Sequence, residues 1–130
     1  MKPKLPPRKT LIKQLDALFA LKIALRDKRL RHGLCPFHTQ CVPATQTFHF
    51  ITRGKHSVRW DDRNAVRACG GCNVRFEHEA GFIDQVFTWY KTTHGQEVWD
   101  KLIFDGNQRA GFSRTDLMEL KEKMRAELAG

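Results

Sequence analysis

The sequence predicts a small α+β domain in which two short strands and a helix occupy the middle of the chain and further helices flank them on both sides. Its 130 residues are enough for one domain, and apolar residues recur at helical spacing near both ends. Between these ends, a β-branched and aromatic stretch lies inside a frame of four cysteines. We therefore divide the chain into a basic arm and helix at 1–33, a core at 34–80, and the helical remainder of the same domain at 81–130.

The first segment predicts a flexible arm followed by an amphipathic helix. Residues 1–9 hold three prolines and four basic side chains, a composition typical of a flexible arm. We expect a helix from Thr10 to Arg31, capped by Thr10 and stopped by Gly33. Its apolar face consists of Leu11, Leu15, Leu18 and Leu25, widened by Ile12, Phe19, Ile23 and Leu30.

The middle segment predicts a strand at Thr47–Thr52, a turn at 54–57 and a short second strand at Val58–Trp60. A polar turn at 61–64 follows, and a helix begins at Cys72 and ends near Glu79.

Three helical stretches complete the chain. Each is marked by an apolar face: Phe82, Val86, Trp89 and Tyr90; then Val98, Leu102 and Ile103 after Gly95; then Leu117, Leu120, Met124 and Leu128. The last begins at a capping box, Ser113 to Asp116, with Asp in place of the usual Glu or Gln.

The cysteines predict a structural zinc site. Cys69-Gly-Gly-Cys72 is a zinc knuckle, and a first pair, Cys35 and Cys41, lies about thirty residues earlier. His38 makes this first pair ambiguous, because Cys35 with His38 would form a C-x-x-H knuckle and leave Cys41 free. We prefer the four-cysteine site because of thiolate affinity and the even cysteine count. Such a site would supply folding energy to a segment with few large apolar residues.

Disulfides, free buried thiols and a redox C-x-x-C are the alternatives to zinc. The basic N-terminus has no continuous apolar segment after it, so we expect no signal peptide and an intracellular, reducing setting. Such a setting favours metal over disulfides. No stretch approaches eighteen apolar residues, so we expect no membrane span.

The positive charge is concentrated rather than spread. The net charge is +9, with a balance of +8 in residues 1–33, +4 in 53–75 and −3 from 76 onward. A basic surface of this kind suits a polyphosphate, because each neutralised phosphate releases condensed counterions. We expect nucleic acid as the partner. The candidate phosphate-binding residues are Arg26, Lys28, Arg29, Arg31, Arg53 and Arg59, although cations at the end of the first helix also suit its dipole.

Residues 35–80 resemble the HNH, or ββα-metal, endonuclease superfamily. The resemblance rests on Phe-His-Phe-Ile-Thr-Arg-Gly at 48–54, Arg-Trp-Asp-Asp-Arg-Asn at 59–64 and Cys-Gly-Gly-Cys-Asn at 69–73. Within the superfamily, this string looks most like the phage NinG (Rap) recombination nucleases. The resemblance implies a zinc-braced ββα core at 34–80 and metal-dependent cleavage of DNA in phage or prophage recombination or repair.

The resemblance also implies roles for three residues. His49 would be the general base, and Asn64 would hold the His49 ring or the loop that carries it. Asn73 would offer an oxygen to a catalytic Mg or Mn ion, with His49 as a second candidate ligand. One departure bears on this ion: the superfamily usually has Asp or His before the catalytic histidine, and here Phe48 stands there. The groups that could replace that ligand are His49 itself, Glu77, His78 and Asp61.

Two other functions compete with the nuclease. One is a non-catalytic zinc module that binds nucleic acid through the same basic surfaces, and the lack of an acid at position 48 favours it. The other is a protein-interaction domain that uses the acidic, aromatic C-terminal helices. Cleavage of DNA, binding without cleavage, and absence of DNA affinity distinguish the three.

Overall fold

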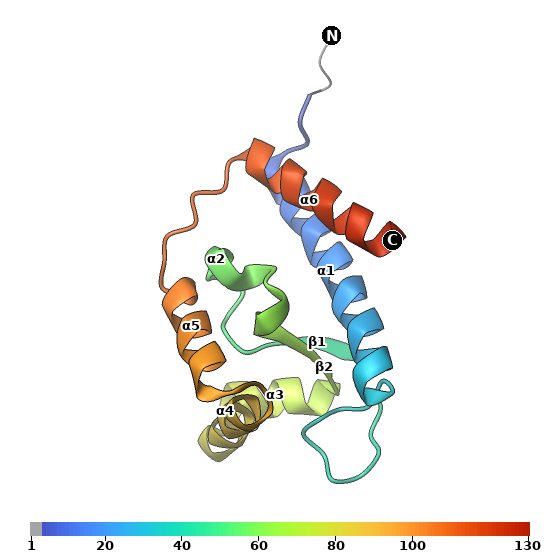
Figure 1. Ribbon diagram of the computed structural model, residues 1–130, viewed down its shortest axis with the longest axis vertical. Coiled ribbons are helices and arrows are strands. Elements are labelled where there is room, and N and C mark those ends of the chain that lie inside the picture. The colour runs from blue at the N-terminus through green and yellow to red at the C-terminus, as the bar shows by residue number, and fades with distance from the viewer. Residues whose placement is uncertain (1–3) are drawn as a thin grey trace.

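The computed structural model describes residues 4–130, so the first three residues of the expected arm lie outside it. It is an α+β fold with six helices and a two-stranded antiparallel sheet in the described part. The sheet lies in the middle of the molecule, α1 and α6 cross beside it, and α3, α4 and α5 lie at its other side (Figure 1). The elements are α1 Arg8–Arg31, β1 Gln46–His49, α2 His56–Arg59, a 3₁₀ turn Asp62–Asn64, β2 Ala65–Ala68, α3 Gly70–His78, α4 Ala80–His94, α5 Gln96–Gly106 and α6 Arg114–Ala129.

Helix α1 starts earlier than expected and buries a narrower stripe. Pro7, not Thr10, is its N-cap; the helix ends at Arg31, and its C-cap, His32, is in the left-handed conformation with φ of 56°. The buried positions repeat every fourth residue: Leu11, Leu15, Phe19, Ile23 and Asp27. Leu25 and Leu30 were expected on this face but are 53% and 61% exposed. Leu25 lies about half a turn away from the buried row, and Leu30 lies beyond Asp27, the last buried position of the helix.

The second strand is not where the sequence placed it. Val58 and Trp60 are buried, but they belong to a short helical turn, α2, and its end. The strand that pairs with β1 is Ala65–Ala68, with His49 opposite Ala65 and Gln46 opposite Ala68. Two apolar residues on either side of Arg59 give the alternating pattern that is typical of a strand. The true strand, Ala-Val-Arg-Ala, has little strand propensity of its own. Strand β1 also ends at His49 rather than Thr52.

The C-terminal helices agree more closely with the expectation. Helix α3 begins at Gly70, two residues before the expected start, and α4 follows it after a single residue. Phe82, Val86 and Tyr90 are buried along α4. The capping box of α6 is confirmed, since Ser113 Oγ accepts from the Asp116 N–H and the Asp116 carboxylate accepts from the Ser113 N–H. Across the described residues, no helix combines the length and hydropathy that a membrane crossing requires.

Two apolar clusters lie on either side of the strands. One joins the sheet to α3, α4 and α5 and contains Phe48, Val66, Tyr90 and Leu102. The other joins α1 to α6 and contains Leu15, Phe19, Trp60 and Leu117. The strands and the loop between them are therefore held from two sides.

Candidate functional site

Four side chains that can hold a metal ion converge at the start of α3. The donor atoms of Cys35, His38, Cys69 and Cys72 all lie within 4.8 Å of one another. The Cys35 and Cys72 sulfurs are 3.7 Å apart, and His38 Nε2 lies 3.2 Å from the Cys69 sulfur and 3.3 Å from that of Cys72. A tetrahedral zinc ion with bonds of about 2.3 Å to sulfur and about 2.0 Å to nitrogen sets its donors roughly 3.5–3.8 Å apart. Both the spacing and the donor types of this Cys3His cluster therefore fit zinc.

The prediction of a four-cysteine zinc site is wrong for Cys41. Cys41 is exposed and outside the cluster, and His38 takes the place that it was expected to fill. The cause is the way the loop closes: the Cys35 N–H donates to the Val42 carbonyl at 2.8 Å, and Leu34 forms a bridge with Pro43. This closure directs the middle of the loop toward α3 and leaves Cys41 on its outer side.

The surroundings of Cys69 in the cluster favour its ionised form, the thiolate. Burial opposes ionisation of Cys69, but hydrogen bonds from the Cys72 N–H and from neighbouring side chains, His38 among them, outweigh it and lower the pKa of Cys69 to about 7. A thiolate is the form that binds metal.

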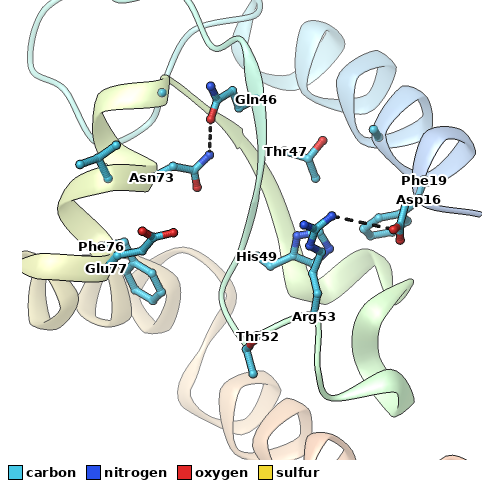
Figure 2. Close-up of a pocket in the computed structure, with 13 residues that line it drawn as sticks. Asp16, Phe19, Gln46, Thr47, His49, Thr52, Arg53, Asn73, Phe76 and Glu77 are labelled. Carbon is cyan, nitrogen blue, oxygen red and sulfur yellow. Dashed lines mark hydrogen bonds and ion pairs between the residues drawn. The ribbon is translucent and has the colours of Figure 1, made fainter. Parts of the chain in front are cut away.

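A cavity of about 610 Å³ lies beside this cluster, between α1, β1 and α3. Figure 2 shows that His49 and Gln46 enter it from β1, Asn73 and Glu77 from α3, and Asp16 and Phe19 from α1. Two of the three expected functional residues, His49 and Asn73, thus line one cavity.

His49 is oriented by one hydrogen bond. Its Nε2 lies 3.1 Å from the Arg59 carbonyl oxygen. Because a carbonyl oxygen only accepts, Nε2 carries the proton, and Nδ1 of the neutral ring keeps a free lone pair. Burial lowers the pKa of His49, the bond to Arg59 opposes this, and the charge of Arg53 adds to the lowering. The imidazole is therefore neutral at pH 7, with one basic nitrogen available.

Asn73 is fixed by a neighbour from β1. Its Nδ2 donates to Gln46 Oε1 at 2.7 Å, and the side-chain oxygen Oδ1 of Asn73 has no hydrogen-bond partner among residues 4–130 (Figure 2). Gly70 makes room for this contact, since a Cβ there would lie 2.9 Å from Gln46 Nε2. Oxygen donors of this type suit Mg or Mn.

Asn64 lies outside the cavity, and its side chain forms hydrogen bonds with the backbone of the preceding loop. It is fully buried, and its Oδ1 accepts from the Ile51 N–H at 2.7 Å. Its Nδ2 donates to the carbonyls of Ile51 and Val58, both at 3.1 Å. The side chain thus closes the loop between His49 and β2 and makes no direct bond to the imidazole.

The residues that could replace the acid usual before the catalytic histidine differ in whether they reach the cavity. Phe48 is fully buried in the aromatic core and faces no solvent. Glu77 lines the cavity, one turn after Asn73. Asp61 is bound by Arg63 at 2.6 Å, and neither Asp61 nor His78 lines the cavity. Glu77 is thus the one carboxylate from α3 in a position to act beside Asn73.

The expected phosphate-binding arginines near the cavity differ in what they already bind. Arg59 is 14% exposed and forms a two-pronged ion pair with Asp16, with contacts of 3.0 and 2.6 Å. Arg53 is 60% exposed, and its one described ion pair, with Asp16, is 3.8 Å long. Arg53 is therefore available to a ligand, whereas Arg59 is engaged in holding α1 to the loop.

The basic residues at the end of α1 divide in the same way. Arg26 and Arg31 bind the buried carboxylate of Asp27, and Arg26 also donates to the Ala65 carbonyl. Lys28 and Arg29 are exposed. Arg26 fastens α1 to β2, Arg31 binds Asp27 within α1, and Lys28 and Arg29 face solvent.

Sequence reasoning missed Asp16 and Gln46. The charge pattern held a signal for Asp16: it and Asp27 are the two acids among ten basic residues in 1–33, and both bind arginines in the fold. For Gln46, no sequence signal was present.

Comparison of the chain with protein-family models, with curated proteins and with solved structures finds no match.

Proposed function

We propose that this protein is a zinc-braced, metal-dependent DNA endonuclease of the HNH type in which His49 is the general base. The observation that carries the proposal is the bond from His49 Nε2 to the Arg59 carbonyl, because it leaves Nδ1 as the basic atom. A neutral imidazole with a lowered pKa is suited to accept a proton from water at physiological pH.

In this reaction the oxygen of a water molecule attacks the phosphorus while His49 Nδ1 takes its proton. The bond from phosphorus to the 3′ oxygen then breaks, and that oxygen takes a proton from solvent. The products are a 5′ phosphate and a 3′ hydroxyl. The chain's contribution is to hold the base in one tautomer and to exclude bulk water from one side of it, since Phe19 contacts the His49 ring at 5.7 Å between centroids.

A catalytic Mg or Mn ion would be held by the free carbonyl oxygen of Asn73 and by Glu77. Both lie on one face of α3 in the same cavity, and their oxygen donors fit a hard cation. Such an ion would stabilise negative charge on the phosphate and the leaving oxygen. Glu77 would then supply the anionic group that Phe48 does not.

DNA would approach over the exposed cations. Arg53 at the cavity, with Lys28 and Arg29 at the end of α1, would contact phosphates, because these side chains have no strong partner in the described residues. A role in phage recombination or repair on duplex or branched DNA follows from the resemblance to the NinG nucleases.

Plasmid DNA and a branched junction are the substrates for the test, with protein that holds one zinc per chain by elemental analysis. Cleavage is expected only after Mg or Mn is added, and His49→Ala should abolish it without changing zinc content or thermal stability. His94→Ala is the matched control, since His94 lies at the end of α4 outside the cavity. Metals are withheld by dialysis rather than by a chelator, because a chelator would also remove the zinc.

A second function is favoured by one observation. Phe48 is packed in the core where an acidic ligand is usual, so the domain could bind nucleic acid without cleaving it. DNA binding that survives His49→Ala, with no cleavage under Mg or Mn, would establish this non-catalytic role.

A further inference from the structure

A second carboxylate besides Glu77 reaches the cavity, and it comes from α1. Asp16 lies on α1, and its Oδ1 accepts hydrogen bonds from Arg59 Nε at 3.0 Å and Trp60 Nε1 at 2.9 Å. Its Oδ2 accepts from Arg59 Nη2 at 2.6 Å. Burial alone would raise the pKa of Asp16, but the bonds from Arg59 and Trp60 outweigh it and lower the pKa. Asp16 is therefore an anion that fastens the end of α2 to α1.

Arg59 connects this carboxylate to His49. The Arg59 carbonyl is the group that accepts from His49 Nε2, and the Arg59 side chain also donates to the Arg53 carbonyl at 3.0 Å. Two bonds to Asp16 and one to the Arg53 carbonyl thus hold the Arg59 side chain in place. On the same helix, Phe19 lies against the imidazole ring (Figure 2). Helix α1 therefore acts on both the plane of the ring and the proton that it carries.

We propose that Asp16 is a positioning residue for His49: by gripping Arg59 it holds the Arg59 carbonyl where it keeps the imidazole protonated at Nε2 and free at Nδ1. The catalytic consequence rests on the proposed function, but the ring tautomer does not. A bidentate Arg–carboxylate pair suits this role, because its two parallel bonds fix orientation as well as distance.

The simpler explanation is that Asp16 only fastens two elements together, and the chain offers a matched control for it. Asp105 is 26% exposed and binds Arg63 at 2.8 Å, whereas Asp16 is 27% exposed and binds Arg59 at 2.6 Å. Asp105 is on α5 and does not line the cavity. Asp105→Asn therefore shows what breaking a comparable ion pair does when its arginine does not bond to His49.

The test is nitrogen-15 NMR of the His49 ring in zinc-loaded protein at pH 8, comparing wild type, Asp16→Asn and Asp105→Asn. Wild type and Asp105→Asn should each show one protonated and one unprotonated ring nitrogen. In Asp16→Asn the two resonances should move toward each other, because both tautomers are populated. Arg59→Lys should give the same result, since an ammonium cannot span both carboxylate oxygens, and the double variant should be no worse than either single variant.

Kinetics supply the second readout. Asp16→Asn should lower kcat on DNA by about 10–100-fold, the usual effect of losing a group that orients a reactive imidazole, while KM changes by less than about twofold. Wild-type ring resonances in Asp16→Asn would overturn the proposal, and if that variant does not fold, the same result in Arg59→Lys would do so. A tautomer shift in a protein that never cleaves DNA would support the positioning role and refute the nuclease instead.

Discussion

Asn64→Ala should destabilise the protein strongly although Asn64 touches no ligand. The side chain is fully buried, and it bonds to both backbone groups of Ile51. No other backbone partner is described for either of these groups, whereas the Val58 carbonyl also accepts from the Asp61 N–H. The substitution therefore leaves one N–H and one carbonyl of Ile51 without a partner.

The expected loss is about 3 kcal/mol in the free energy of unfolding. Ile51 is half-buried; an N–H that loses its partner costs about 1–3 kcal/mol when it is buried, and the lost carbonyl bond adds about 1 kcal/mol. This is a large part of the 5–15 kcal/mol or so that is usual for one domain. Because the loop that Asn64 closes begins next to His49, the proposed cleavage should also fall at temperatures where the variant is still folded.

Urea denaturation of zinc-loaded protein measures this loss. Asn107→Ala is the control, since Asn107 is exposed at the end of α5, and it should change stability by no more than about 0.5 kcal/mol. Asn64→Asp should be as harmful as Asn64→Ala, because it places a negative charge against the carbonyls of Ile51 and Val58. An Asn64→Ala cost below about 1 kcal/mol would refute the view that this side chain closes the loop.

Three further predictions concern the cluster and the cavity. His38→Ala should reduce zinc below one per chain and lower the melting temperature, whereas Cys41→Ser should do neither. Elemental analysis and thermal melts measure both effects. Zinc loss in Cys41→Ser alone would instead support the four-cysteine site. Arg53→Gln should weaken DNA binding and reduce the salt slope by about 1 without loss of stability, whereas Arg59→Gln should lower stability; equal stability of the two would contradict their assignment. Because burial and the charge of Arg53 lower the pKa of His49, the acid limb of the pH–kcat/KM profile should lie below pH 6.5 in wild type and move upward in Arg53→Gln, since removing a positive charge raises that pKa.

The parts of the fold that depend on local pattern were predictable. The capping box at Ser113 and the apolar face that begins at Phe82 depend on residues within a few positions of one another, and both occur as expected. The second strand failed because its position is decided by pairing with β1 rather than by local propensity. Val58 and Trp60 are buried, but a helical turn against α5 and α1 buries them as well as a strand would.

The candidate site shows the same limit. The spacing of Cys35, His38 and Cys41 allows two zinc sets. It does not encode the loop closure, through the Cys35–Val42 hydrogen bond and the Leu34–Pro43 bridge, that accompanies the choice of His38. Asp16 could not be placed, because its contact with Arg59 depends on how α1 crosses the sheet. Only the concentration of charge hinted that an acid in this segment would find a basic partner.

The metal cluster and the cavity share one short piece of chain, and this makes them interdependent. Cys72 is a cluster member, and the next residue, Asn73, lines the cavity. Both follow Gly70, whose missing side chain lets Gln46 reach Asn73. A zinc ion that fixes Cys69 and Cys72 therefore also fixes the first turn of α3 and the direction of the Asn73 amide. Helix α1 does the same for His49 from the opposite wall, through Arg59. The two walls of the cavity are thus held by different interactions, the Cys3His cluster on one side and the Asp16–Arg59 ion pair on the other. Losing either should therefore displace the functional side chain on its own wall and leave the other wall intact.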